Sequence, residues 1–340
     1  MNELHATISK LAAPGKGILA ADESVATISK RFNALGIEST DKTRQAYRDL
    51  LVTTPGLSDF VAGIILFEET LLQTTLDGHA FPEKLQQLGI LPGIKVDKGL
   101  IHLPNTRDEQ VTQGLDGLAE RLQQYKAKGA CFAKWRAVYA ISDNTPSMLA
   151  IKTNAECLAR YAAICQSVGI VPIVEPEVLI DGTHTIERCA EVSERVLHAV
   201  FHALYRHKVK LEYIVLKPSM VISGKQCPEQ ASIDDVAALT LTVLKRTVPA
   251  AVPTINFLSG GQSSEDATAH LNAMNASGNL PWNVSFSYAR ALQDYAMRIW
   301  HGESKMAAAA QAAFYARAQL NSLAALGKYN VSMEKEKFVA

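Results

Sequence analysis

Short apolar segments alternate with longer segments of helical periodicity along most of the chain. Eight apolar segments, several rich in β-branched residues, are typical of strands that are covered on both faces. They lie in GILAADES (17–24, with the strand at 18–21), FVAGIILFEE (60–69), LPGIKVDKG (91–99), GACFAKWRAVY (129–139), IVPIVEPEVL (170–179), LEYIVLKPSM (211–220), TINFLSGGQ (254–262) and WNVSFSYAR (282–290). Helical spacing of apolar residues predicts helices near 3–13, 40–53, 108–128, 153–168, 184–206 and 305–326.

This alternation predicts an α/β fold, a single closed (β/α)8 TIM barrel with an N-terminal helix. Lys95, Lys134, Glu175, Lys217 and Ser259 stand at the ends of successive strands, 39, 41, 42 and 42 residues apart. Each interval has room for one strand, one crossover helix and loops. We therefore expect one catalytic barrel domain.

The predicted barrel domain covers residues 1–326, and a polar C-terminal tail follows at residues 327–340. The tail, GKYNVSMEKEKFVA, contains few apolar residues. Few apolar contacts can hold such a segment, so we expect it to be mobile.

Charged residues recur two positions apart near the ends of three successive strands. Residues two apart in a strand point to the same face. The pairs are Lys95 with Asp97, Lys134 with Arg136, and Glu175 with Glu177. An unpaired buried ion is costly, so repeated charges at core-facing positions predict a site at the mouth of the barrel.

Lys217 ends an apolar strand and is followed by Pro218, which cannot continue the ladder. A lysine attacks a carbonyl only as the free amine, although its reference pKa is about 10.4. Burial and the ammonium group of Lys134 would both lower that pKa, which makes Lys217 a candidate Schiff-base nucleophile.

Imine formation also needs a proton donor, and cleavage of a carbon–carbon bond needs a base. Glu175, supported by Glu177, is our candidate acid, because carboxyl groups in charged, apolar pockets can donate protons near neutral pH. Asp22 is our candidate base, because a closed barrel places the first strand beside the eighth.

The sequence indicates an anion-binding site after the predicted seventh strand. There FLSGGQS contains two adjacent glycines, Gly260 and Gly261. Glycines let backbone N–H groups approach an anion, and TIM barrels often bind phosphate after strands seven and eight. Arg290, just beyond strand eight, could hold the same phosphate with two hydrogen bonds.

Composition narrows the class of protein. Lys plus Arg and Asp plus Glu both number 34, so no basic field suited to nucleic acid is present. The five cysteines form no CxxC pair, and no run of 18 apolar residues occurs. We expect a cytoplasmic protein without a membrane or nucleic-acid partner, acting on a small molecule without a metal or other cofactor.

The motifs resemble, in their order and spacing, those of class I fructose-1,6-bisphosphate aldolases. The motifs that carry this resemblance are GILAADES, GIKVDKG, AKWR, VPIVEPEVL, VLKPSM, FLSGGQS and FSYARALQ. The resemblance covers residues 3 to 330. It implies a metal-independent homotetramer of glycolysis and gluconeogenesis that reversibly cleaves fructose 1,6-bisphosphate into dihydroxyacetone phosphate and glyceraldehyde 3-phosphate.

The resemblance also implies a role for each matching residue. Lys217 would form the Schiff base, Glu175 would be the acid and base of imine formation with help from Lys134, and Asp22 would take the proton of the C4 hydroxyl. The residues implied to line the site or bind phosphate are Lys95, Arg136, Glu177, Ser259, Gly260, Gly261, Arg290, Ser24, Thr27, Lys30 and Arg31.

Four places depart from the family's pattern. Val25-Ala26-Thr27 stands for Thr-Gly-Ser, Glu212-Tyr213 for Glu-Gly, Ala289 for a glycine, and Phe338-Val339-Ala340 for an end in tyrosine. The first three bear on phosphate affinity, and the fourth bears on proton transfer.

Three other functional hypotheses compete with that of a class I aldolase. A metal-dependent aldolase or hydrolase could use His198 and His202, four apart on a predicted helix, but no HExxH or carboxylate partner accompanies them. A barrel retained only as a binding scaffold is opposed by the competent residues at every proposed catalytic position. A transaldolase-like enzyme would act on a monophosphate, whereas two apparent phosphate sites favour a bisphosphate.

Overall fold

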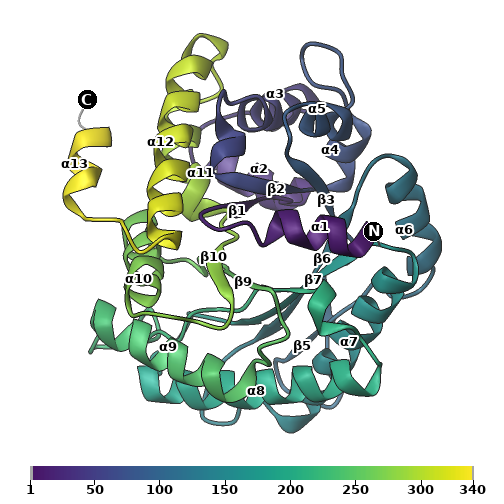
Figure 1. Cartoon of the computed structure of the whole chain (residues 1–340), viewed down its shortest axis with the longest axis vertical. Coiled ribbons are helices and arrows are strands. Elements are labelled where there is room, and N and C mark those ends of the chain that lie inside the picture. Colours follow the sequence, from purple (N-terminus) through teal and green to yellow (C-terminus); the bar gives the residue numbers. More distant parts are fainter. Residues whose placement is uncertain (1–2, 339–340) are drawn as a thin grey trace.

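Eight strands run parallel around a central axis, and helices cover the outer face of the sheet (Figure 1). The computed structural model describes residues 3–338. The barrel strands are β1 (Gly17–Ala21), β2 (Val61–Leu66), β3 (Leu91–Lys95), β6 (Phe132–Tyr139), β7 (Val171–Val178), β8 (Val215–Leu216), β9 (Thr254–Phe257) and β10 (Asn283–Phe286). A separate antiparallel pair consists of β4 (Leu100–His102) and β5 (Gln110–Thr112).

Helices follow the strands in the order expected of a (β/α)8 fold. Their bounds are α1 (Glu3–Leu11), α2 (Val25–Asn33), α3 (Asp41–Val52), α4 (Glu68–Leu72), α5 (Phe81–Gln87), α6 (Leu118–Ala127), α7 (Met148–Ser167), α8 (Ile186–Arg206), α9 (Ile233–Thr247), α10 (Ser264–Ala276), α11 (Arg290–Trp300), α12 (Ala307–Ala325) and α13 (Ser332–Phe338). The sheet order is β1-β2-β3-β6-β7-β8-β9-β10. The Ala20 N–H donates to the Tyr288 carbonyl at 2.9 Å and brings the first and last strands together, which confirms the predicted barrel.

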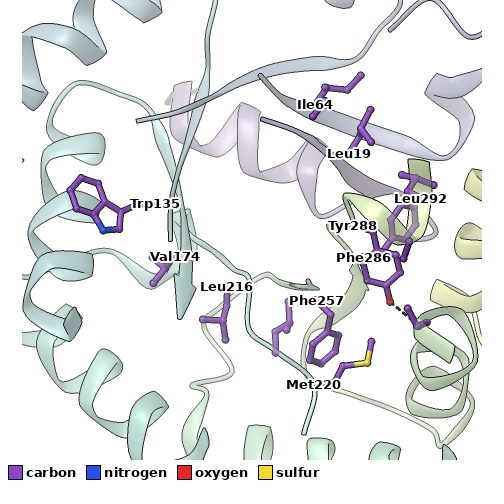
Figure 2. Packing of buried hydrophobic residues seen from close by; sticks show 14 of the residues in the cluster. Leu19, Ile64, Trp135, Val174, Leu216, Met220, Phe257, Phe286, Tyr288 and Leu292 are labelled. Carbon is purple, nitrogen blue, oxygen red and sulfur yellow. Dashed lines mark hydrogen bonds between the residues drawn. The ribbon is translucent and has the colours of Figure 1, made fainter. Parts of the chain in front are cut away.

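The outward faces of the strands form the main hydrophobic core with the surrounding helices. Figure 2 shows Leu19, Ile64, Trp135, Val174 and Leu216 pointing away from the barrel axis toward this layer. All five are fully buried. Burial on both faces explains why the strands are continuous apolar runs rather than alternating ones.

The inward faces change from apolar to charged along the barrel axis. At the amino-terminal end, Ile18, Phe132 and Val171 pack with Leu4 and Ile8 of α1. Helix α1 lies across this end of the barrel and covers it (Figure 1). The opposite end, where the strands terminate, is therefore the open one and carries the charges.

Several local predictions were wrong. Residues 211–213 form a short 3₁₀ helix, so only two residues of the predicted sixth strand belong to β8. The predicted helix at 108–128 begins at Leu118, because residues 110–112 pair with β4 instead. Helix α2 was not predicted, although Ser24 caps it and Ile28 and Phe32 are buried.

The tail after residue 326 contains α13, which contacts α12 through a buried charge. Arg317 of α12 is fully buried, and its guanidinium donates to both carboxylate oxygens of Glu334, at 2.8 and 2.6 Å. The Tyr329 hydroxyl donates to the same carboxylate at 2.9 Å. The tail's mobility stays a prediction, and Val339 and Ala340 lie outside the described residues.

Gly93 of β3 faces Phe132 of β6 at the base of the barrel, and a Cβ atom at residue 93 would lie 2.2 Å from that ring. We expect Gly93→Ala to lower the free energy of unfolding by about 1–3 kcal/mol, because a close-packed core must shift to admit the methyl group. Chemical denaturation measures this loss. Gly93→Ala combined with Phe132→Leu should lose less than the two single changes together, and an unchanged midpoint for Gly93→Ala would contradict this packing.

Candidate active site

A cavity of about 670 Å³ opens at the carboxyl-terminal ends of the barrel strands. It is lined by every predicted site residue except Gly261. Those residues are Asp22, Ser24, Thr27, Lys30, Arg31, Lys95, Lys134, Arg136, Glu175, Glu177, Lys217, Ser259, Gly260 and Arg290. The structure therefore brings together side chains from all parts of the chain, as the predicted barrel requires.

Strand register explains why the charged side chains converge. Lys95 of β3 is paired with Lys134 of β6, and Arg136 is paired with Glu175 of β7. Alternate residues of a strand share a face, so the pairs two apart both enter the cavity. Glu177 accepts a hydrogen bond from Arg136 across the strands.

Lys134 lies at the centre of the charge cluster. Its ammonium nitrogen is 2.8 Å from Asp22 Oδ2, 3.2 Å from Glu175 Oε2 and 3.9 Å from Asp97 Oδ2. Only 4% of its side chain is exposed. The three carboxylates around this buried ammonium group stabilise its positive charge.

The pKa shifts follow from this arrangement. Burial alone would lower the pKa of Lys134, but the charges of Asp22, Glu175 and Asp97 outweigh burial and raise it above its ordinary value. Burial alone would raise the pKa of Asp22, but Lys134, Lys217 and Lys95 lower it from 3.8 to about 2. At neutral pH Lys134 is therefore an ammonium group and Asp22 a carboxylate.

Lys217 shares Glu175 with Lys134. The Lys217 ammonium nitrogen lies 3.3 Å from Glu175 Oε1, and its side chain is almost fully buried. Its backbone N–H donates to the Val174 carbonyl at 2.8 Å, which extends the β7 pairing to the last residue before Pro218. The short strand β8 thus ends by placing Lys217 directly beside the Glu175 carboxylate.

The turn after β9 lies beside the start of α11 at the edge of the cavity. Gly260 and Gly261 have φ of +59° and +99°, a region that favours glycine. A Cβ atom on Gly261 would lie 3.3 Å from Arg290 Nη2, so the turn and this arginine are adjacent. Ser259 is buried beside them, and Ala289 lines the cavity without closing it.

The second group of predicted phosphate residues belongs to α2. The Ser24 hydroxyl caps this helix by accepting from the Thr27 N–H, and Thr27 Oγ1 lies 3.1 Å from Ser24 Oγ. Lys30 and Arg31 follow one turn later and line the cavity. Arg31 is not free in this structure, because it pairs with Glu23 and Asp294.

The prediction missed three residues that contribute to this region. Asp97 was noted beside Lys95, with which it forms a 2.8 Å ion pair, but it was not assigned to the site. Glu23 lines the cavity, and Gln293 joins α11 to β1 by donating to the Ala20 carbonyl at 2.6 Å. Spacing within a strand could have identified Asp97, but contacts between distant elements leave no such signal.

The histidines considered as metal ligands lie elsewhere. His198 and His202 border a separate groove between α7 and α8, together with Lys152 and Arg206. Within residues 3–338, no group of three or more His, Cys, Asp or Glu side chains is arranged to hold a metal ion. In the same range no helix combines the length and apolarity needed to cross a bilayer.

Comparison with known proteins identifies the family. The family model for fructose-bisphosphate aldolase class-I matches residues 3–339. The chain belongs to the class I fructose-bisphosphate aldolase family. It is 54% identical over 330 residues to a probable class 1 fructose-bisphosphate aldolase of Xanthomonas campestris, covering 97% of this chain and 99% of that protein.

Other members of the family show the same close relation. The cytoplasmic isozyme of spinach is 54% identical, with 96% of this chain and 92% of that protein covered. A solved structure of fructose-bisphosphate aldolase from Plasmodium falciparum superposes with a TM-score of 0.95 at 51% identity, covering 96% of this chain and 95% of that one. These relations support lyase activity as a class I fructose-bisphosphate aldolase, and enzymes of this class work without a metal ion.

Replacing Lys134 tests the electrostatic balance of the site. In Lys134→Met the pKa of Asp22 should rise from about 2, because the strongest cation opposing the effect of burial is lost. Side-chain carbon-13 NMR titration measures this pKa. Lys95→Met is the matched control and should give a smaller rise, so a larger rise in that variant would contradict the assignment.

The same change has a predictable effect on acid stability. A carboxylate with a lowered pKa stabilises the fold above its unfolded pKa, and this contribution is lost as pH falls toward the folded pKa. For Asp22 this window runs from 3.8 down to about 2. The free energy of unfolding should therefore fall less steeply in this window in Lys134→Met than in the unmodified protein.

Proposed function

We propose that the enzyme reversibly cleaves fructose 1,6-bisphosphate into dihydroxyacetone phosphate and glyceraldehyde 3-phosphate through a Schiff base on Lys217. The observation that carries this proposal is the contact between Lys217 and Glu175, 3.3 Å apart, with only 4% and 5% of their side chains exposed. A proton passing from Lys217 to Glu175 produces a free amine and a carboxylic acid, the two forms that imine formation requires.

Imine formation then proceeds in balanced steps. The Lys217 amine adds to the C2 carbonyl of the sugar, and the carbinolamine hydroxyl leaves as water after receiving a proton from Glu175. Lys134 remains an ammonium group and stabilises the oxygen that gains negative charge. The product is a protonated imine, which is the electron sink for the next step.

Our proposed base for cleavage is Asp22, which follows β1 and lies 2.8 Å from Lys134. It takes the proton of the C4 hydroxyl, the C3–C4 bond breaks, and the bonding electrons move to the imine to form an enamine. Glyceraldehyde 3-phosphate leaves as the aldehyde. Protonation of the enamine and hydrolysis release dihydroxyacetone phosphate and restore Lys217.

We propose that a substrate with two phosphates binds with one phosphate at each end of the cavity. We assign one phosphate to Ser259, Gly260, Gly261 and Arg290, where backbone N–H groups and a guanidinium can meet it. The other phosphate would lie near α2, with its N-terminus and the side chains of Lys30 and Arg31. Lys95, Arg136 and Glu177 would contact the sugar between them.

The biological setting follows the family. We propose a cytoplasmic homotetramer that serves glycolysis and gluconeogenesis, without a nucleic-acid or membrane partner. Among the relatives, the spinach protein is a cytoplasmic isozyme, whereas an Arabidopsis protein that is 55% identical is chloroplastic. Size-exclusion chromatography with light scattering would test the tetramer, since a stable monomer would contradict it.

Borohydride trapping tests the covalent step. After incubation with dihydroxyacetone phosphate, reduction should attach one triose phosphate to Lys217 and abolish activity, because the reduced imine cannot hydrolyse. Peptide mass spectrometry locates the added mass. Lys217→Met should take up no label, and label on Lys134 or Lys95 in the unmodified protein would refute the proposal.

Arg290→Ala tests the phosphate assignment. Loss of a charge-assisted hydrogen bond worth roughly 1.5–3 kcal/mol should weaken binding of phosphorylated ligands about ten- to hundredfold. Inhibition constants for sugar phosphates measure this effect. Arg298→Ala, in the last turn of the same helix and exposed, is the matched control and should leave them unchanged. Unchanged constants in Arg290→Ala would exclude this role.

A further inference from the structure

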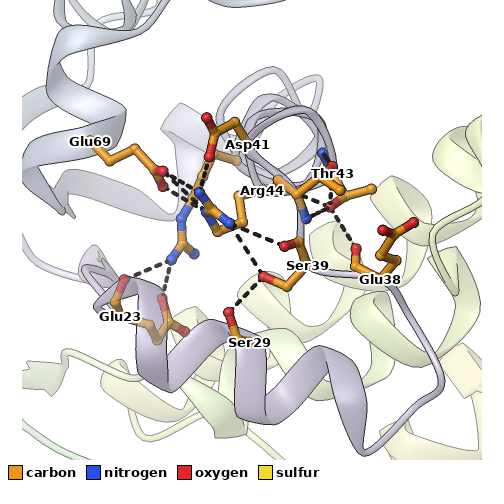
Figure 3. A network of polar contacts seen from close by, with 10 residues as sticks. Glu23, Ser29, Glu38, Ser39, Asp41, Thr43, Arg44 and Glu69 are labelled. Atoms are coloured by element: carbon orange, nitrogen blue, oxygen red, sulfur yellow. Dashed lines mark hydrogen bonds and ion pairs between the residues drawn. The ribbon is translucent and has the colours of Figure 1, made fainter.

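Glu23 lies between two arginines at the edge of the cavity. It follows Asp22 in sequence, and only 8% of its side chain is exposed. One carboxylate oxygen pairs with Arg31 of α2, and the other lies 2.8 Å from Arg48 Nη2 of α3. The Arg48 guanidinium also donates to the Glu23 carbonyl at 3.4 Å. Figure 3 shows Glu23 at the edge of a network of polar contacts that also contains Arg44.

Arg31 is neutralised before any ligand arrives. Its Nη1 donates to Glu23 and, at 3.1 Å, to Gln293 Oε1, while Nη2 donates to Asp294 at 3.0 Å. Two carboxylates, those of Glu23 and Asp294, therefore face one guanidinium. Arg48 is a second cation, and it pairs with Glu23. A phosphate that binds the Nη1 side of Arg31 must compete with Glu23.

Releasing Arg31 would leave Glu23 without its first partner. A buried carboxylate with no partner is costly, but the contact with Arg48 involves the other oxygen and need not break. We propose that Arg48 is a positioning residue, which keeps Glu23 paired when Arg31 turns toward the second phosphate of the substrate. Arg48 thereby sets the preference for a sugar bisphosphate over a sugar monophosphate.

This inference rests on the proposed function, in which the cavity accepts a sugar with two phosphates. Arg48 itself does not line the cavity, and it is 3% exposed, so it acts through Glu23 and Arg31 rather than on the ligand. Its charge cannot be lost at physiological pH. The arrangement thus provides a permanent counter-charge for Glu23.

Arg44 provides a control on the same face of α3, one turn before Arg48. It is similarly buried, but it pairs with Glu69 at 2.5 Å and with Asp41, and within residues 3–338 no ion pair joins it to Glu23 (Figure 3). Replacing Arg44 also removes an ion pair made by α3, the pair with Glu69. A general loosening of this helix would therefore affect Arg44 and Arg48 variants alike.

The test compares kcat/KM for fructose 1,6-bisphosphate with kcat/KM for fructose 1-phosphate, which forms the same imine. In Arg48→Met the ratio of these constants should fall about tenfold, the size expected for an unpaired buried charge. Arg48→Lys should restore most of the ratio, because it keeps a cation near Glu23. Arg44→Met should leave the ratio unchanged, and a similar fall in both methionine variants would overturn the proposal.

A second comparison separates a positioning role from a structural one. In a Glu23→Gln background, Arg48→Met should no longer change the ratio of the two kcat/KM values, because the negative charge that pairs with Arg48 is absent. An equal fall in both backgrounds would overturn the proposal. Should Arg48→Met not fold, Arg48→Gln removes the charge with less loss of polar contact and should give the same fall.

The failure of this proposal is distinguishable from the failure of the proposed function. If the unmodified protein cleaves neither sugar and takes up no label at Lys217, both are wrong. If it cleaves both and the ratio in Arg48→Met and Arg48→Gln equals that of the unmodified protein, only the role of Arg48 is wrong.

Discussion

A buried ammonium group can persist in this barrel only because carboxylates from several strands surround it. Lys134 meets Asp22 from the end of β1, Glu175 from β7 and Asp97 from the segment after β3. All three carboxylates raise the pKa of Lys134, so the positions of all three matter to its charge. The register of the strands must therefore bring these carboxylates to Lys134 at the carboxyl-terminal end of the barrel.

Inside the barrel, an apolar layer and a charged layer follow one another along the barrel axis. Inward positions at the amino-terminal end pack with α1, while charged side chains lie at the carboxyl-terminal end. The apolar layer closes the barrel beneath these charges, and burial strengthens electrostatic interactions. The chemistry proposed for Lys217 and Glu175 therefore depends on an apolar layer that does not contact the substrate.

Much of this architecture could be predicted from the sequence because its signals are local. The regular spacing of Lys95, Lys134, Glu175 and Lys217 predicted the barrel, and alternation within strands predicted which side chains share the cavity. Helix α2 was missed although Ser24 at its N-cap and the apolar residues Ile28 and Phe32, four apart, are local signals for it. The role of Glu23 was missed because its partners come from two helices, and no spacing within a segment reports such a contact.

The ring of Phe132 occupies space that a side chain at position 93 would otherwise take, so two neighbouring strands share one volume. Close packing therefore constrains the combined volume of the side chains at positions 93 and 132 rather than either volume alone. A lineage that gained a larger residue at position 93 would have to carry a smaller one at position 132. Across homologous barrels these positions should therefore show correlated substitutions, even though neither residue contacts the cavity.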